Sequence, residues 1–257
     1  MPESRITVLL LNHRRPENIP IILDSIGQQT CKADIFLWDN SNSDWEDSRV
    51  TWRIRSSKNG YCWPRWFMAS QAETPYFVTL DDDICFSQSG VLSTIVDLLD
   101  NAKHKDQLIG PEGVRLSNGC PYFPLYVGRV RRQVPPNDVS SSVHFHNVDI
   151  DQPVDIIKGR SLAGRTDVIR QLPLWHADGL LCDDIVLSGL VSRGRPCHHL
   201  VPSDLANCFV DLPGVNGPMA LSQMPEWGVT REDATRRAFA SHDHAVTVID
   251  KACKCED

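Results

Sequence analysis

The stretch "YFVTLDDDICFS", Tyr76–Ser87, sets three adjacent carboxylates directly behind an apolar run. Aspartate is disfavoured in strands, and neighbouring like charges repel one another unless positive charge lies among them. We therefore interpret the apolar run as a buried strand and its acidic end as the rim of a sheet where a cation is held. Asp81 and Asp83 have Asp-x-Asp spacing, so two oxygen ligands can face one divalent ion. The alternative is a polar turn that begins the next helix.

The segments around this stretch alternate between strand and helix patterns. Continuous β-prone runs predict buried strands, and apolar residues three and four positions apart predict helices between them. Strands are expected at Arg5–Asn12, Asp34–Trp38, Val50–Ser56, Thr74–Leu80, Leu108–Ile109, Pro153–Gly159 and Arg195–Pro202. Helices are expected at 16–27, 63–73, 90–99, 165–172, 181–194 and 231–240. Long irregular segments are expected at 119–147 and 203–228. Such alternation is typical of right-handed βαβ units, so the expected fold class is α/β with a mostly parallel sheet.

Polar residues stand where several of the expected strands end. Asn12 ends the first strand, Asp39 follows the second, and Asp81 follows the fourth. In parallel sheets, ligands bind beyond the carboxyl ends of the strands. These three side chains therefore predict a ligand site along one rim of the sheet.

The composition is that of a globular protein, with 257 residues, 41% hydrophobic, 23% charged and a formal net charge of -7. Because no long basic run is present, the chain is not expected to bind a nucleic acid polymer through its phosphates. No apolar run approaches the roughly 20 residues of a membrane-spanning helix, and we expect no signal peptide. The nine cysteines are scattered without the paired spacing of a zinc site, so we expect reduced thiols and a cytoplasmic protein.

Three segments, in this order, resemble the opening of the GT-A fold glycosyltransferases, in particular glycosyltransferase family 2. They are "TVLLLNHRRPENIPIILDSIGQQT", "IFLWDNSNSD" and "KNGYCWPRWFMASQAETPYFVTLDDDI", and they lie within residues 7–84. The resemblance implies a single GT-A (Rossmann-like) domain over residues 1–257, with a mostly parallel sheet flanked by helices. Its first part, approximately residues 1–110, would bind a nucleotide sugar, and residues 111–257 would bind the acceptor.

The resemblance also implies roles for individual side chains. Those near the nucleotide would be Asn12, Arg15, Asp39, Asn40, Asn59, Asp81 and Asp82, and the segment "KGRSLAGR" would lie under the donor sugar with Gly159 and Arg160. Asp83, with Asp81, would hold Mn²⁺ or Mg²⁺ on the diphosphate of a UDP- or GDP-sugar. A late histidine, His242 or His244, would be a third metal ligand. The simpler readings are an Asx turn for Asp39 and an exposed cation at the helix start for Arg15.

A second acidic pair, Asp183 and Asp184 in "GLLCDDIVLSGL", stands at the beginning of an expected helix. Acidic residues there interact favourably with the helix dipole, so plain capping is one explanation. The resemblance implies another, because these enzymes carry a Glu-Asp pair here whose second acid takes the proton of the acceptor hydroxyl. Asp184 would then be the base and Asp183 an orienting group. The Asp-Asp variant also resembles the exostosin-like glycosyltransferases, which retain anomeric configuration, so the stereochemistry stays open.

The expected activity is the metal-dependent transfer of a sugar to a hydroxyl of a glycan or another acceptor, with inversion favoured. A sugar-phosphate nucleotidyltransferase would need a glycine-rich phosphate loop after the first strand, and this chain has "NHRRPENIP" there. A phosphoesterase would need an early histidine–aspartate cluster for a second metal, which we do not find. A non-catalytic carbohydrate-binding domain of the same fold is the remaining alternative, and it predicts no hydrolysis of nucleotide sugars.

Overall fold

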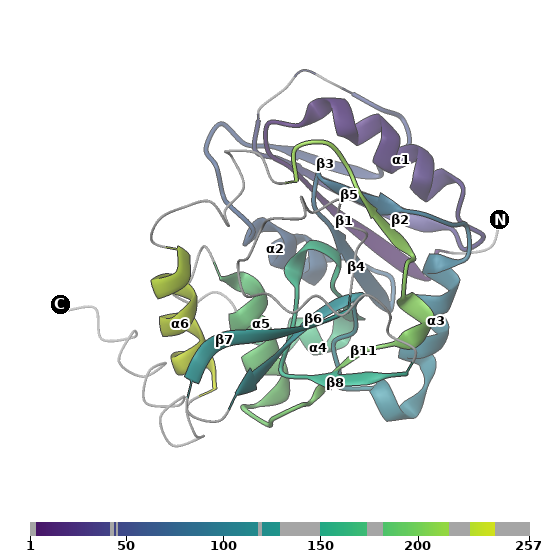
Figure 1. Ribbon diagram of the computed structural model, residues 1–257. Coiled ribbons are helices and arrows are strands. Elements are labelled where there is room, and N and C mark those ends of the chain that lie inside the picture. Colours follow the sequence, from purple (N-terminus) through teal and green to yellow (C-terminus); the bar gives the residue numbers. More distant parts are fainter. Residues whose placement is uncertain are drawn as a thin grey trace.

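The computed structural model describes residues 4–41, 44, 46–117, 120–128, 150–173, 182–215 and 227–239 (Figure 1). The strands in this part of the chain are β1 (Ile6–Asn12), β2 (Ala33–Asp39), β3 (Trp52–Arg55), β4 (Tyr76–Leu80), β5 (Ile84–Phe86), β6 (Glu112–Ser117), β7 (Cys120–Gly128), β8 (Gln152–Val154), β9 (Ile156–Ile157), β10 (Ala163–Arg165), β11 (His199–Val201) and β12 (Phe209–Asp211). The α-helices are α1 (Ile19–Gly27), α2 (Pro64–Gln71), α3 (Val91–Asp100), α4 (Thr166–Arg170), α5 (Asp183–Ser192) and α6 (Trp227–Ala238). The predicted α/β class is confirmed.

A five-stranded sheet in the order β10-β4-β1-β2-β3 forms the centre of the fold. β1, β2, β3 and β4 run parallel, and β10 is antiparallel to β4. Asn12 pairs in register with Asp39, and Leu10 pairs with Leu80. The carboxyl ends of these strands therefore meet at one rim, and Asp81 follows Leu80 there, as the sequence predicts.

Apolar clusters pack on both faces of the central sheet, and the helices that contribute to them flank it (Figure 1). β1 is buried along its whole length, and its alternate side chains point to opposite faces. Val8 and Leu10 pack with residues of α1 and α3 in one core cluster, whereas Leu9 and Leu11 pack with residues of α2 and α5 in another. The apolar stripe predicted for the first helix lies in the first of these clusters. Burial on both faces explains why β1 is a continuous apolar run.

The later part of the chain forms small antiparallel pairings beside this sheet. β6 pairs with β7 and β9, β8 pairs with β11, and β5 pairs with β12. α5 and α6 lie side by side next to β7 (Figure 1), and a third core cluster joins α5 and α6 to β6 and β9 through Val114, Ile156, Ile185 and Ala234. None of the helices in the described residues has the length and apolar character needed to span a bilayer.

One correction concerns Cys120–Gly128, which we expected to lie in a long loop. It forms β7 and pairs antiparallel with β6. Pro121 and Pro124 are compatible with this strand because β7 is at the edge of its sheet, where proline is tolerated. The rest of the expected loop, residues 129–147, lies outside the described residues.

Three smaller expectations also need correction. Phe209–Asp211 is strand β12, in a stretch expected to be irregular, and it is too short for a pattern to reveal. The expected strand Pro153–Gly159 divides at Asp155 into β8 and β9, and the Asp155 carboxylate accepts a hydrogen bond from the backbone of Leu116 (2.7 Å). At Leu108–Ile109 the structure has an isolated bridge of Ile109 to Ala163 and Leu200 rather than a strand.

Candidate active site

The buried carboxylate of Asp39 ties together the ends of the first three strands. Its Oδ1 accepts hydrogen bonds from Asn12 Nδ2 (3.0 Å) and Ser41 Oγ (2.6 Å), and its Oδ2 lies 2.8 Å from Arg53 Nη2. A buried carboxylate is tolerated when charged and polar partners surround it in this way. Asn12 and Asp39 therefore lie in contact at the rim of the sheet, as predicted.

Asn40 and Asn59 shape the segment that follows β3. Asn40 Oδ1 accepts hydrogen bonds from Trp38 Nε1 (3.1 Å) and from the backbone N–H of Gly60 (2.8 Å), and its Nδ2 donates to the carbonyl of Tyr61 (3.2 Å). Asn59 Oδ1 accepts from the backbone N–H of Tyr61 (2.8 Å), which is an Asx turn. Asn40 thus holds residues 60–61 against the end of β2, beside Asp39, and Asn59 closes the turn within that segment.

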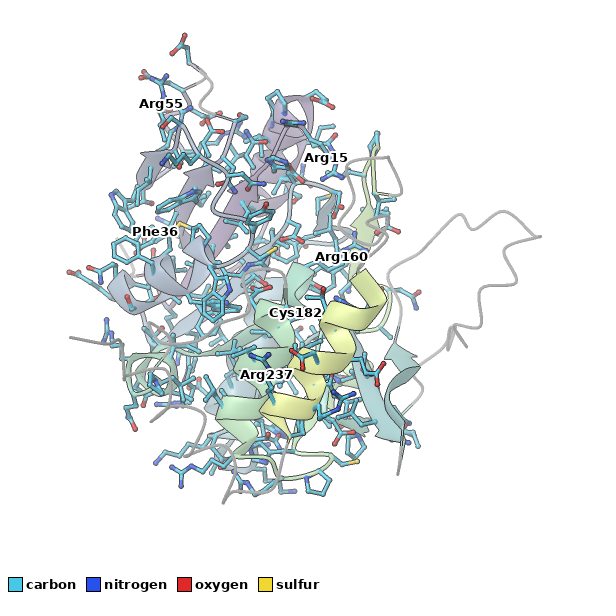
Figure 2. All side chains as sticks on the ribbon, turned by 90° about the vertical axis from the view of Figure 1, so that its left-hand side faces the viewer. Arg15, Phe36, Arg55, Arg160, Cys182 and Arg237 are labelled. Carbon is cyan, nitrogen blue, oxygen red and sulfur yellow. The ribbon has the colours of Figure 1, made fainter. Side chains whose placement is uncertain are left out.

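The three carboxylates after β4 each face an arginine from a different segment. The pairs are Asp81 with Arg65 (2.8 Å), Asp82 with Arg15 (2.5 Å) and Asp83 with Arg160 (3.0 Å). An opposite charge beside each carboxylate offsets the repulsion among them. Figure 2 looks onto this region and shows Arg160 between Arg15 and Cys182, the residue that precedes α5.

Asp82 anchors the loop after β1 to the acidic turn. Its carboxylate also accepts from the backbone N–H of His13 (2.5 Å), and Asn18 Nδ2 donates to its carbonyl oxygen (2.8 Å). Burial raises the pKa of Asp82 to about 7, although the Arg15 guanidinium acts in the opposite direction. Arg15 also donates to the carbonyl of Gly214 (2.9 Å). Through their ion pair, Arg15 and Asp82, both predicted to lie near the nucleotide, form one connected unit.

Gly159 and Arg160 begin a 3-10 helix, Gly159–Ser161, that lies beside both acidic groups. The Gly159 carbonyl accepts from Thr79 Oγ1 of β4 (2.6 Å) and from Arg65 Nη1. Arg160 Nη2 is shared between Asp83 (3.0 Å) and Asp211 (2.6 Å). Burial would lower the pKa of Arg160, but Asp83 and other carboxylates raise it, so the side chain is charged. The structure therefore brings this predicted segment to the acidic turn.

The second acidic pair opens α5, and both carboxylates are buried. Asp184 Oδ2 lies 3.2 Å from Lys158 Nζ and 3.7 Å from Arg231 Nη2. Asp183 Oδ2 lies 3.4 Å from Arg65 Nε, an ion pair at this distance although the oxygen makes no hydrogen bond within the described residues.

The two members of this pair differ in their affinity for a proton. Burial would raise both pKa values, but Lys158 and Arg231 lower the pKa of Asp184 below its ordinary value. Burial keeps the pKa of Asp183 raised, because Arg65 opposes it incompletely and Asp184 adds repulsion. Asp184 is therefore the more firmly ionised group, and Asp183 is the readier proton acceptor.

Four charged residues around the two acidic groups were missed by the sequence-based prediction. Arg65 had a usable signal, because it is a charged residue within the otherwise buried face of a helix. Lys158 stands directly before the predicted Gly159, but nothing local connects it with Asp184. Asp211 and Arg231 belong to distant segments, and their contacts become visible when the chain is folded. The predicted metal ligands His242 and His244 lie outside the described residues.

A divalent cation fits this donor set. The carboxylates are Asp81, Asp82, Asp83, Asp183, Asp184 and Asp211, and the basic groups that face them in the described residues are Arg15, Arg65, Lys158, Arg160 and Arg231. Burial raises the pKa of Asp83, although Arg160 and Arg15 act in the opposite direction. Among the described residues, no group of three or more His, Cys, Asp or Glu side chains is arranged to hold a metal ion. A cation at a nucleotide does not need three protein ligands, because Mg²⁺ there is typically held by one or two carboxylates together with phosphate oxygens, and Mn²⁺ suits the same ligands.

Comparison with known proteins identifies the fold. No protein-family description matches the chain, and no curated protein matches its sequence. The fold is similar to that of S. aureus TarS (TM-score 0.52, 13% identity over 82% of this chain and 37% of TarS). It is also similar to the mannosyltransferase PcManGT from Pyrobaculum calidifontis, solved in complex with GDP-Man and Mn²⁺ (TM-score 0.56, 12% identity over 98% of this chain and 74% of PcManGT). The chain therefore has the GT-A glycosyltransferase fold, as predicted, and it spans little more than a third of TarS.

Proposed function

We propose that this protein is a metal-dependent glycosyltransferase that moves a sugar from a nucleotide diphosphate sugar to an acceptor hydroxyl. One observation carries the proposal. At the rim of a GT-A sheet, the acidic turn after β4 and the acidic start of α5 meet through one arginine, Arg65, which lies 2.8 Å from Asp81 and 3.4 Å from Asp183. The first group suits a cation and a diphosphate, and the second suits the proton of a hydroxyl. Sugar transfer needs both.

On the donor side, Asp81 and Asp83 would hold Mn²⁺ or Mg²⁺. The cation would offset the charge that develops on the leaving diphosphate. Arg15 and Arg160 lie within 3.7 Å and 3.0 Å of Asp83, so they can add positive charge beside the phosphates. The wall formed by Asn12, Asp39, Asn40 and Asn59 would receive the base and ribose, with Gly159 beneath the donor sugar. The complex of PcManGT with GDP-Man and Mn²⁺ supports a UDP- or GDP-sugar as the donor class.

On the acceptor side, the Asp183–Asp184 pair would supply the base. A sugar hydroxyl becomes an effective nucleophile when a carboxylate takes its proton in the transition state, and a base works best with a pKa near the operating pH. The environments described above favour Asp183 for that role. Asp184, held by Lys158 and Arg231, would then orient the acceptor. This exchanges the roles that the family resemblance implies for the two residues.

We propose that the reaction inverts the anomeric centre, because one carboxylate that accepts the hydroxyl proton is sufficient for direct displacement of the diphosphate. The anomeric configuration of the product, read by proton NMR, tests this point. Retention would instead place the enzyme with the exostosin-like transferases. A glycan is the first acceptor class to examine.

The decisive experiment is a panel of UDP- and GDP-sugars, each measured by calorimetry and by nucleotide release with Mn²⁺ and with a chelator. We expect at least one donor to bind and to be slowly hydrolysed with Mn²⁺ but not with the chelator. Asp83→Ala should abolish the metal-dependent binding. The matched control is Asp100→Ala. Asp100 is the last residue of α3, and its exposed carboxylate pairs with Arg5. If no donor binds or is hydrolysed, the chain is a non-catalytic domain and the proposal fails.

A further inference from the structure

Arg65 is a buried guanidinium whose contacts reach three separate parts of the chain. It lies in the first turn of α2, and its side chain is 1% exposed. Its Nη2 pairs with Asp81 after β4, its Nε pairs with Asp183 at the start of α5, and its Nη1 donates to the carbonyl of Gly159. Nε also donates to the carbonyl of Cys62 (3.0 Å) within its own segment. Nearly every polar group of the side chain is therefore engaged.

A purely structural arginine does not account for these contacts. Burying a guanidinium is costly, and the hydrogen bond of Arg65 to the Cys62 carbonyl before α2 would need no carboxylate from another segment. At Arg65, the two carboxylates raise the pKa of the guanidinium although burial would lower it, so the charge is held in place. The two acids that it joins belong to opposite sides of the proposed reaction. The planar guanidinium of an arginine can donate to Asp81 in a fixed direction and keep its charge beside Asp183, whereas the ammonium of a lysine is a single point charge.

We propose that Arg65 is a positioning residue, which fixes Asp81 and Asp183 relative to each other and so aligns the cation-binding side of the site with its proton acceptor. The inference rests on the proposed function, and it adds a residue that neither acidic motif contains. Gly159 belongs to the same arrangement, because its carbonyl accepts a hydrogen bond from Nη1 of Arg65. Displacement of either acid by about 1 Å is enough to lower a rate by about 100-fold.

The charges around Asp183 determine what loss of Arg65 does to its proton affinity. Arg65 lowers the pKa of Asp183, whereas Asp184 and Asp81 raise it. Lys158 and Arg231 face Asp184, so they keep that neighbour ionised and repulsive. Without Arg65, Asp183 therefore faces two carboxylates with its own counter-ion removed, and it should bind its proton more tightly.

The test compares Arg65→Lys and Arg65→Met with Arg170→Lys. Arg170 is a suitable control because its guanidinium donates to the carbonyls of Ser70 and Ala72 at the end of α2 and pairs with no carboxylate of the site. We expect both Arg65 variants to lower kcat for donor hydrolysis by about 100-fold, with a much smaller change in KM. The acid limb of the pH–rate profile should move to higher pH in Arg65→Met and stay in place in Arg170→Lys. Melting temperatures identify any variant that fails to fold.

A second measurement needs no substrate. Carbon-13 NMR of the aspartate carboxyl groups should show Asp183 titrating at higher pH in Arg65→Met than in wild type or Arg170→Lys. If wild type hydrolyses a donor but the Arg65 variants keep kcat, or Asp183 titrates unchanged, the inference is overturned and the proposed function stands. If wild type acts on no donor while the NMR shift is present, the proposed function fails and the Arg65–Asp183 coupling is supported.

Discussion

The ammonium nitrogen of Lys158 lies 3.2 Å from Oδ2 of Asp184. That contact separates the two members of an acidic pair that look equivalent in the sequence. Asp184 has Lys158 and Arg231 beside it and a lowered pKa, whereas Asp183 has Arg65 beside it and a raised pKa. Neighbouring carboxylates with pKa values pushed apart by their surroundings can divide acid–base work between them.

The first prediction concerns this division of labour. Asp183→Asn should lower donor hydrolysis by about 100-fold or more, because it removes the proton acceptor, and donor binding should persist. Asp184→Asn should instead reduce stability, on the order of 3 kcal/mol, because it leaves Lys158 and Arg231 buried without their shared carboxylate. Urea unfolding, calorimetry and nucleotide release measure the three quantities. A fully active Asp183→Asn beside a stable, inactive Asp184→Asn would return the base to Asp184.

The second prediction is a pH dependence of the rate. Burial raises the pKa of Asp183 to about 6, so its ionised fraction declines as the pH falls below that value. kcat/KM for donor hydrolysis should therefore fall about tenfold per pH unit on the acid side of pH 6. Initial rates between pH 4.5 and 8 test this, and Asp183→Glu should move the limb. A limb that stays in place in Asp183→Glu, near pH 7, would point to Asp82 instead.

The third prediction concerns the close approach of Gly159 to the second acidic pair. A Cβ at Gly159 would lie 3.1 Å from the Cβ of Asp184 and 3.2 Å from Nη1 of Arg65, so Gly159→Ala should push these groups apart. We expect a loss of activity of about 10- to 100-fold, with a destabilisation of about 1–3 kcal/mol. Gly27→Ala is the matched control, since no atom lies within 4 Å of its added Cβ. Equal activity in the two variants would contradict the packing that we describe.

The fourth prediction is a loss of stability in acid that depends on His199. Its Nδ1 accepts from the backbone N–H of Leu108 (3.2 Å), and its Nε2 donates to the carbonyl of Ser188 (2.9 Å), so the buried ring is neutral. Burial lowers its pKa from 6.5 to about 3. The unfolded chain therefore binds a proton near pH 6.5 that the folded protein refuses, and stability falls as the pH decreases below that value.

Between pH 7 and pH 4.5 this single histidine should remove about 2–3 kcal/mol from the free energy of unfolding. Urea unfolding of wild type and His199→Gln at both pH values isolates the effect, because contributions of the carboxylates are shared by the two proteins. The variant should begin less stable at pH 7 and lose less on acidification. Identical losses in the two proteins would rule out His199 as the source.

Much of the fold follows from local patterns. The β1 run, the apolar stripe of α1 and the acidic end of β4 are readable because burial repeats with the period of each element. β7 and β12 were missed for different reasons. In β7, two prolines conceal a strand that lies at the edge of its sheet, and β12 is too short to show a period.

The candidate site divides in the same way. Its acidic groups can be found in the sequence, because strand and helix ends mark them, and Arg15 and Arg160 were predicted as site residues. Which cation faces which carboxylate could not be predicted. Arg65, Lys158 and Arg231 come from separate segments, and no spacing rule links them to Asp183 or Asp184.

The sequence by itself determined the alternation of strands and helices, and it determined that Asn12, Asp39 and Asp81 stand at strand ends, because both are properties of short contiguous segments. The tertiary structure alone decided which cation faces each carboxylate, and therefore which aspartate binds a proton readily. The physical reason is that a pKa depends on burial and on charges within a few ångströms, and packing brings those charges together from distant parts of the chain.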